Sequence, residues 1–327
     1  MGNKAWETNT NFILIAVPLF LLMGELMLRS GMGERMYTAV SRWISFLPGG
    51  LIHTNIASCA IFAACSGSSV ATSATISRVS LPTFRTRGYS ERLVIGSLAA
   101  GGTLGILIPP SIGLIVYGVL VEESIGRLYL AGFIPGIMLA VMMLAMIIGA
   151  SILVPSIAPK EPGSSWRLKM VGLLSMIPVI IIIMVVLGSI YAGLATPTEA
   201  AAFGVTGALV LALLNNSGPP ITGWLLSKLS GSTSSASTLA RWRERYPVVD
   251  GQMRQSMTNN FDMIKDAVLS TVRTSSMIML IVVAAFTLSF AFARLGISHD
   301  ISQWIINMEL SSTQLVLSLI HISEPTR

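Results

Sequence analysis

The sequence predicts an all-α protein that crosses a membrane several times. Hydrophobic residues make up 53 % of the 327 residues and charged residues only 11 %, whereas soluble domains carry roughly 25 % charged residues. Apolar runs that reach the roughly 20 residues needed to cross a bilayer recur along the chain. The sequence also contains 29 Gly, a residue that is commoner in membrane helices than in soluble ones.

The first 50 residues predict two helices of different kinds. The segment 11–28 is apolar and reads as a membrane helix that ends at Arg29. The segment 32–46 mixes charged, apolar and aromatic residues, which is typical of an amphipathic helix lying in the membrane interface.

The next apolar stretch, 51–84, is interrupted near its middle by the Gly/Ser-rich run 63–72. Each arm would be roughly 24 Å long as a helix, which is short of the roughly 30 Å hydrocarbon core. We therefore expect a re-entrant helical hairpin with its tip at Gly67. The alternative is one continuous helix whose small polar residues allow close packing.

A second interruption follows in the apolar run 93–120. Pro109 and Pro110 lie inside the segment 105–113, and proline both lacks an N–H and clashes with the preceding helical turn. This pattern predicts two half-helices joined by an unwound link. The hairpin and the broken helix together occupy segment 51–122.

Segment 123–214 is expected to contain further membrane helices, at 125–153, 168–194 and from Pro197 to 214. Thr196 and Glu199 have the spacing of a capping box at the start of the last of these helices.

Three more segments complete the organisation of the chain. Segment 215–262 is polar and predicts a cytoplasmic loop. Segment 263–317 predicts incomplete membrane helices of a second repeat, with spans at 267–293 and 301–320. In segment 318–327 the apolar run gives way to polar residues. These residues resemble translated sequencing-adapter read-through, so we expect a non-native tail.

The distribution of basic residues supports the hairpin. If 51–84 enters and leaves on one side, all but four of the 21 Lys and Arg residues fall on the same face. The positive-inside bias makes that face cytoplasmic. A full crossing at 51–84 would instead place the long basic loop outside. The four exceptions are Lys4, Arg127, Arg294 and Arg327.

The two interruptions offer groups suited to ions. Free N–H groups at half-helix N-termini suit an anion, and unwound carbonyls suit a small cation such as Na⁺. Hydroxyl groups add further ligands, although each could instead bond to its own helix. The hydroxyl-bearing residues are Ser66, Ser68, Ser69, Thr72, Thr103 and Ser111.

Other polar residues favour structural roles. Glu25 is expected to pair with Arg29, and Asn55 to form a hydrogen bond between helices. Cys59 and Cys65 lack the spacing of a metal or redox motif and are expected to be packed, reduced thiols.

Two other classes of function remain open from the residues alone. An intramembrane hydrolase with a Ser nucleophile near Gly67 would need a base, but no His lies within an apolar span. A scaffold subunit that transports nothing would not need the two interruptions to meet. Nucleic-acid binding is disfavoured because the net charge of +6 sits in loops, and we expect no enzyme activity and no organic cofactor.

At the interruptions the sequence resembles the large membrane subunit of the tripartite ATP-independent periplasmic (TRAP) transporters. The resemblance covers roughly residues 9–292 and is weakest across 215–260. It is carried by the stretches 18–26, 65–72, 105–118, 132–136 and 196–202.

The resemblance implies a Na⁺-coupled permease of the bacterial inner membrane, in which a transport domain with two hairpins moves like an elevator against a scaffold. It implies a small membrane subunit and a periplasmic solute-binding protein as partners, and a small carboxylate or sulfonate, such as a C4-dicarboxylate, as solute. Family members are longer at both ends, so this chain would be a fragment of an inverted-repeat architecture and would hold half of the site. The resemblance makes segment 1–50 part of the scaffold, segment 51–122 half of the transport domain, and segment 263–317 an incomplete second repeat. The implied Na⁺ ligands are Ser66, Gly67, Ser68 and Thr103. The implied solute ligands are Ser68, Ser69, Thr72, Pro109, Pro110 and Ser111.

Overall fold

The computed structural model describes residues 11–154, 163–217, 260–308, 311 and 314. These residues contain helices and no strands, in agreement with the predicted all-α class. They divide into two units, of which the larger comprises residues 11–277 and the smaller includes residues 278–308. Most of the expected loop 215–262 and the whole expected tail 318–327 lie outside the described residues.

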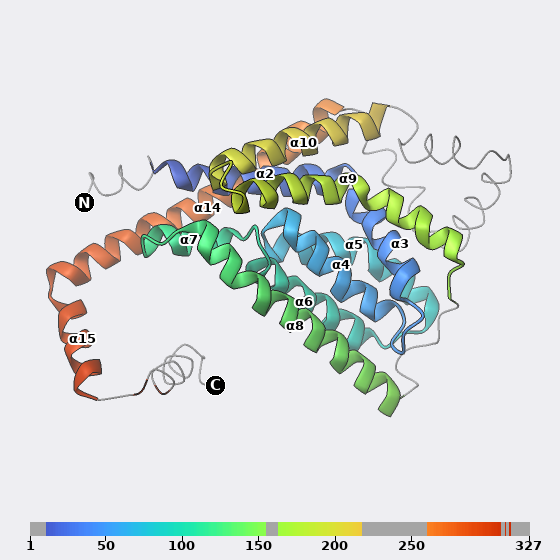
Figure 1. The fold of residues 1–327 in the computed structure, drawn as a ribbon, viewed down its shortest axis with the longest axis horizontal. Helices are drawn as coiled ribbons and strands as arrows, with labels where there is room; N and C mark the ends of the chain where they lie inside the picture. Colours follow the sequence, from blue (N-terminus) through green and yellow to red (C-terminus); the bar gives the residue numbers. More distant parts are fainter. Residues whose placement is uncertain (1–10, 155–162, 218–259, 309–310, 312–313, 315–327) are drawn as a thin grey trace. The chain divides into compact units, whose positions relative to one another are not determined.

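The N-terminal segment forms two helices, as predicted. A 3₁₀ turn, η1 (Phe12–Ile15), leads into α2 (Ala16–Arg29), as expected for the first span. The amphipathic helix α3 (Met32–Ile44) packs against α4, α5 and α9 (Figure 1). Every residue of α3 is buried or half-buried, so its apolar face is covered by neighbouring helices; its place in the membrane interface stays a prediction.

The stretch 51–84 forms two helices, α4 (Leu51–Ser66) and α5 (Ser69–Arg87), which pack against each other and against α6. The start of α4 meets the chain just after α5, because the Leu51 N–H donates to the Tyr89 hydroxyl at 3.1 Å. The two arms therefore fold back as a helical hairpin whose bend is at Gly67, as predicted, and the continuous-helix alternative is excluded.

The second interruption also occurs where it was predicted. Helices α6 (Glu91–Leu107) and α7 (Ile112–Leu120) are separated by residues 108–111 and meet at an angle of 41°. Helix α8 (Ile125–Leu153) follows and packs on α4, α6 and α7.

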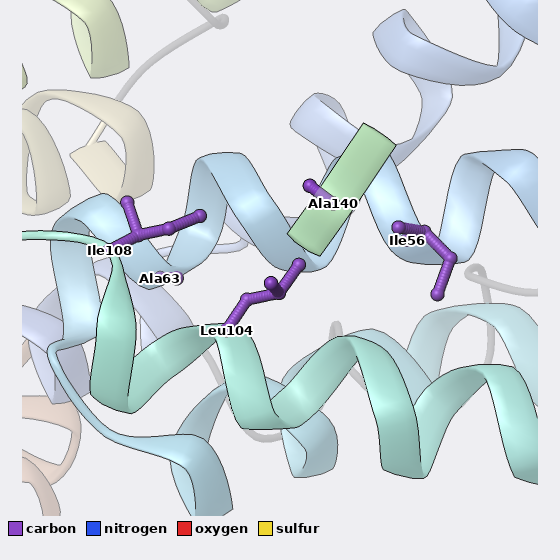
Figure 2. Close-up of a cluster of buried hydrophobic side chains, with 5 residues drawn as sticks. All are labelled: Ile56, Ala63, Leu104, Ile108 and Ala140. Atoms are coloured by element: carbon purple, nitrogen blue, oxygen red, sulfur yellow. The ribbon is translucent and has the colours of Figure 1, made fainter. Parts of the chain in front are cut away.

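A buried apolar cluster holds the hairpin, the broken helix and α8 together (Figure 2). Its members come from three helices and the start of the link. In a bilayer such side chains hold helices together mainly by close van der Waals packing, because lipid tails are as apolar as the side chains themselves. The cluster consists of Ile56, Ala63, Leu104, Ile108 and Ala140.

Two further helices of the larger unit pack on the N-terminal pair, α10 (Pro197–Ser217) on α2 and α9 (Trp166–Tyr191) on α3. Helices α9 and α10 also pack on each other. The predicted capping box is confirmed: Thr196 N–H donates to Glu199 Oε2 at 2.8 Å, and Glu199 N–H donates to Thr196 Oγ1 at 3.3 Å.

Polar contacts between helices match two further expectations. Glu25 pairs with Arg29 at 3.2 Å and also accepts a 2.7 Å hydrogen bond from Ser270. Asn55 donates to Ser97 Oγ at 2.9 Å and accepts from Tyr37 at 3.2 Å, which links α4 to α6 and α3. Cys59 and Cys65 are free and buried, as predicted.

The last described helices begin with α14 (Asn260–Arg294), which is longer than the expected span 267–293. Within the smaller unit, α15 (Ile297–Asn307) follows a left-handed turn at Gly296. The further apolar segment expected from residue 301 begins inside α15, and most of residues 309–320 lie outside the described residues.

By length and composition, four of the described helices are able to cross a bilayer, and the bent pair of α6 and α7 would make a fifth span. The four are Phe12–Arg29, Ile125–Leu153, Trp166–Tyr191 and Asn260–Arg294.

Candidate functional site

The two interruptions of the larger unit meet. The Ile112 N–H, at the start of α7, donates to the Gly67 carbonyl at the hairpin bend over 3.2 Å. A Cβ atom added to Gly67 would lie 2.6 Å from the Pro110 carbonyl oxygen. The bend of the hairpin and the link of the broken helix are therefore in direct backbone contact.

The hairpin bend is built by one Gly and one Ser. Gly67 ends α4 in the left-handed region at φ +59°, a conformation that glycine adopts without the steric penalty of a Cβ, and its N–H donates to Ala63 at 3.0 Å. Ser68 is extended, and its hydroxyl accepts from the Ala71 N–H at 3.4 Å. Ser68 is thus the N-cap of α5.

The link of the broken helix is built in a similar way. Ile108 ends α6 in an extended conformation, and the Pro109–Pro110 peptide bond is cis. Ser111 caps α7 by accepting from the Leu114 N–H at 3.3 Å, and its hydroxyl donates to the Ile106 carbonyl. The link therefore joins the C-terminus of α6 to the capped N-terminus of α7.

The junction consequently gathers four helix ends. The starts of α5 and α7 present N–H groups and the positive ends of their dipoles, while the ends of α4 and α6 present carbonyl oxygens. Such an arrangement has ligands for both an anion and a small cation.

The hydroxyl groups at the hairpin bend form a small network. Ser66 Oγ lies 2.7 Å from Thr72 Oγ1 and 3.4 Å from the Ser68 carbonyl oxygen. The Ser69 hydroxyl is buried, and no described residue forms a hydrogen bond with it. Ser66, Ser68, Ser69 and Thr72 are thus together at the bend, as predicted.

Thr103 is placed differently from the other predicted ligands. It is exposed on α6, and its hydroxyl donates to the Ala100 carbonyl of the same helix at 2.6 Å. The structure does not join this hydroxyl to the network at the bend.

Two glycines allow the hairpin bend to pack closely against α2 and α6. A Cβ on Gly24 of α2 would lie 2.9 Å from Ser66 Cα, and a Cβ on Gly105 of α6 would lie 2.7 Å from the Ser68 carbonyl carbon. In the sequence, both glycines stand out only as parts of the longer stretches that resemble the TRAP family. Their role depends on a close approach between helices, which one sequence does not reveal.

Tyr129 is a further residue at the junction that the sequence did not indicate. This residue of α8 is fully buried, and its side chain lies against the backbone of Ser111. Its position near the start of a long apolar helix gives no signal of this contact.

Comparison with known proteins decides the family. The sequence pattern of the family described as tripartite ATP-independent periplasmic transporter, DctM component, matches residues 1–323. The chain belongs to this family. The match extends into the segment 318–327 that was expected to be a non-native tail.

Individual members of the DctM family are similar to this chain over part of their length. The C4-dicarboxylate TRAP transporter large permease protein of Pseudomonas aeruginosa is 37 % identical over 61 % of the chain and 46 % of the relative. The ectoine TRAP transporter large permease protein of Halomonas elongata is 38 % identical over 61 % of the chain and 46 % of the relative. The sialic acid TRAP transporter large permease protein of Vibrio cholerae is 36 % identical over 62 % of the chain and 47 % of the relative.

The chain spans about half the length of these three relatives. Because the chain belongs to this family, its sequence is that of a TRAP-type large permease. Its described residues include several apolar helices. The names of the relatives include different solutes, so the family alone does not assign one.

Proposed function

We propose that this chain is part of the large permease subunit of a Na⁺-coupled secondary transporter that imports a small organic anion. The observation that supports the proposal most directly is the hydrogen bond from Ile112 to Gly67, which brings four helix ends to one place. Broken membrane helices are tolerated where their backbone is buried in protein or lines a cavity, and in transporters they commonly bind substrate and ions.

The anion would bind at the starts of α5 and α7. Ser68 and Ser111 cap these two helices, and the buried Ser69 hydroxyl is available as a donor at the same place. A carboxylate or sulfonate accepts such hydrogen bonds and interacts favourably with the positive helix ends. Thr72, Pro109 and Pro110 complete the proposed solute site.

The cation would bind at the end of α4. Ser66 and Ser68 supply hydroxyl and carbonyl oxygens, and Gly67 supplies a carbonyl at the bend. Hard cations such as Na⁺ prefer oxygen ligands of this kind. Thr103 is the proposed Na⁺ ligand with the least structural support, because its hydroxyl already bonds to its own helix.

The proposal extends to the assembly in the bacterial inner membrane. The hairpin would be re-entrant, and segment 51–122 would move as part of an elevator-type transport domain within an inverted-repeat fold. A small membrane subunit would brace the scaffold, and a periplasmic solute-binding protein would deliver the solute. These expectations follow from family membership and from the hairpin geometry.

Two alternatives are less well supported. A hydrolase would need a base beside Ser66, but His53 lies 13 residues away on the same helix, which corresponds to roughly 20 Å, and bonds to the Pro48 carbonyl at 2.6 Å. A scaffold without a transport role gives no reason for the two interruptions to meet.

The test is Na⁺-dependent uptake in proteoliposomes that carry the complete permease with its small subunit and solute-binding protein. We expect Ser66→Ala and Ser68→Ala to raise the Na⁺ concentration needed for half-maximal uptake. Ser189→Ala is the matched control, since that hydroxyl bonds to the Val186 carbonyl of its own helix at 3.0 Å. Unchanged Na⁺ dependence in both Ser66 and Ser68 variants would refute the cation site.

The solute class is tested in the same preparation. A panel of a C4-dicarboxylate, sialic acid, isethionate, ectoine and glycerol, which carries no anionic group, is offered to the wild-type transporter. We expect uptake of a carboxylate or sulfonate, and we expect Ser69→Ala to raise the concentration needed for half-maximal uptake. Uptake of a solute that carries no anionic group would contradict the proposed role of the two helix starts.

A further inference from the structure

A second polar feature lies away from the junction, in a pocket of about 170 Å³ between α3 and α9. Its lining is rich in charge for a protein in which only 11 % of residues are charged. The lining residues are Glu34, Arg35, Thr38, Ala39, Arg42, Gly172 and Ser175. None of these residues belongs to the site proposed above.

The pocket carries a net positive charge. Arg35 and Arg42 contribute two positive charges, whereas Glu34 contributes at most one negative charge. Burial raises the pKa of Glu34 to about 7, so this carboxyl is partly neutral near neutral pH. Arg42 is only 7 % exposed and donates to the Leu168 carbonyl at 3.3 Å, which fixes its guanidinium against α9.

Aromatic residues mark the membrane level beside this pocket. Trp43 and Trp166 form an edge-to-face pair with centroids 5.7 Å apart, and the Trp43 indole N–H donates to the Lys169 carbonyl at 3.0 Å. The Lys169 ammonium lies 4.9 Å from the centre of the Phe46 ring. Trp and basic residues gather at the headgroup level of membrane proteins.

The length of α9 supports this placement. Its 26 residues span roughly 39 Å, about 9 Å more than the hydrocarbon core. Trp166 at its first turn is 68 % exposed and therefore belongs near the headgroups. Gly172 and Ser175 lie six and nine residues further along α9 than Trp166, roughly 9 Å and 14 Å, so the two arginines beside them sit close to the boundary between headgroups and acyl chains.

We propose that the pocket between α3 and α9 binds the phosphate of an anionic phospholipid headgroup. Arg35 and Arg42 would donate charge-assisted hydrogen bonds to the phosphate oxygens, and the Thr38 hydroxyl would add a neutral donor. A membrane lipid is favoured over a soluble phosphate because the pocket lies beside the Trp pair that marks the headgroup level. The lipid would fasten α3 to α9, independently of any transported solute.

The proposal is tested by lipid binding to the purified chain in detergent, measured by native mass spectrometry. Dihexanoyl phosphatidylglycerol is the anionic probe and dihexanoyl phosphatidylcholine is its zwitterionic control. We expect preferential binding of phosphatidylglycerol, and we expect the double variant Arg35→Gln, Arg42→Gln to bind it roughly tenfold more weakly. Arg127→Gln, at an exposed arginine of α8, is the matched control and should bind as the wild type does.

A second variant guards against misfolding of the double variant. Ser175→Leu fills the pocket while it leaves both arginines in place, and it should weaken phosphatidylglycerol binding without lowering the thermal unfolding temperature. Wild-type binding by Ser175→Leu would overturn the proposal. Inorganic phosphate serves as a competitor: if it binds the pocket and phosphatidylglycerol does not, the lipid assignment is overturned.

Discussion

A methyl group on Gly67 would lie 2.6 Å from the carbonyl oxygen of Pro110. Gly67 also adopts φ +59°, a conformation that costs other residues roughly 1–2 kcal/mol. The hairpin bend and the link of the broken helix thus require glycine for two separate reasons, one of backbone conformation and one of space.

The first prediction follows from this contact. Gly67→Ala should destabilise the protein by more than the roughly 1–2 kcal/mol of the left-handed conformation, because the new methyl group pushes the bend away from the link. Thermal unfolding in detergent measures the stability, and proteoliposome uptake measures the function of the junction.

Gly88→Ala provides the control for that prediction. Gly88 ends α5 at φ +71°, but a Cβ there would meet no atom within 4 Å. Its substitution should therefore show the conformational cost alone and leave uptake intact. Equal losses in the two variants would show that the contact with Pro110 contributes nothing.

The second prediction concerns the link between α2 and α14. Glu25 bonds to both Arg29 and Ser270, whereas Asp266 bonds to Arg29 from a side chain that is 56 % exposed. Glu25→Ala should cost about 1–3 kcal/mol because it leaves the half-buried Ser270 hydroxyl without its acceptor and removes one of the two carboxylates that pair with Arg29. Asp266→Ala should cost less than about 1 kcal/mol, as is usual for exposed ion pairs. Chemical denaturation of both variants measures the difference, and equal costs would contradict the assignment.

The two interruptions could be predicted from the sequence because their residues act locally. Gly67 with its serine neighbours and the Pro109–Pro110 pair disfavour a continuous helix whatever surrounds them. The direction in which the hairpin enters the membrane, which rests on basic residues counted over whole loops, stays a prediction. The contact of Leu51 with Tyr89 confirms that the two arms fold back.

Contacts between distant segments could not be predicted in the same way. The hydrogen bond from Ile112 to Gly67 joins residues 45 positions apart, and no local pattern specifies such a pair. The apolar face of an amphipathic helix such as 32–46 can be buried either by the membrane surface or by neighbouring helices. The sequence therefore does not reveal that other helices cover this face of α3. Thr103 lies close to Gly105 in the sequence, and this closeness alone predicts a Na⁺ ligand beside the hairpin bend. In the structure its hydroxyl bonds within its own helix.

The third prediction tests the polar link at the base of the hairpin. Asn55 joins α4 to Tyr37 of α3 and Ser97 of α6 in a fully buried place. Asn55→Ala should destabilise the protein by about 1–3 kcal/mol, because buried partners are left unsatisfied. The double variant Asn55→Ala, Tyr37→Phe should lose less stability than the sum of the losses in the two single variants, since both substitutions remove the same hydrogen bond. Strict additivity would exclude that bond.

The fourth prediction concerns pH and Glu34. Burial raises the pKa of this carboxyl from 4.5 to about 7, while the charge of Arg35 opposes the shift. Between pH 4.5 and about pH 7, Glu34 is therefore more often protonated in the folded state than in the unfolded state. The stabilisation from neutral Glu34 is fully present below pH 4.5 and is lost as the pH rises through about 7. Arg35 and Arg42 are the other charged groups that line its pocket.

Glu34→Gln should remove this pH dependence, because glutamine stays neutral. We expect the variant to be more stable than the wild type at about pH 8.5 and to lose that advantage at about pH 5. Glu123→Gln, at an exposed residue of the loop before α8, controls for the Glu-to-Gln exchange itself. The difference between the thermal unfolding temperatures of variant and wild type, followed across this range, separates Glu34 from every other titrating group. A difference that does not change with pH would show that Glu34 is ionised throughout.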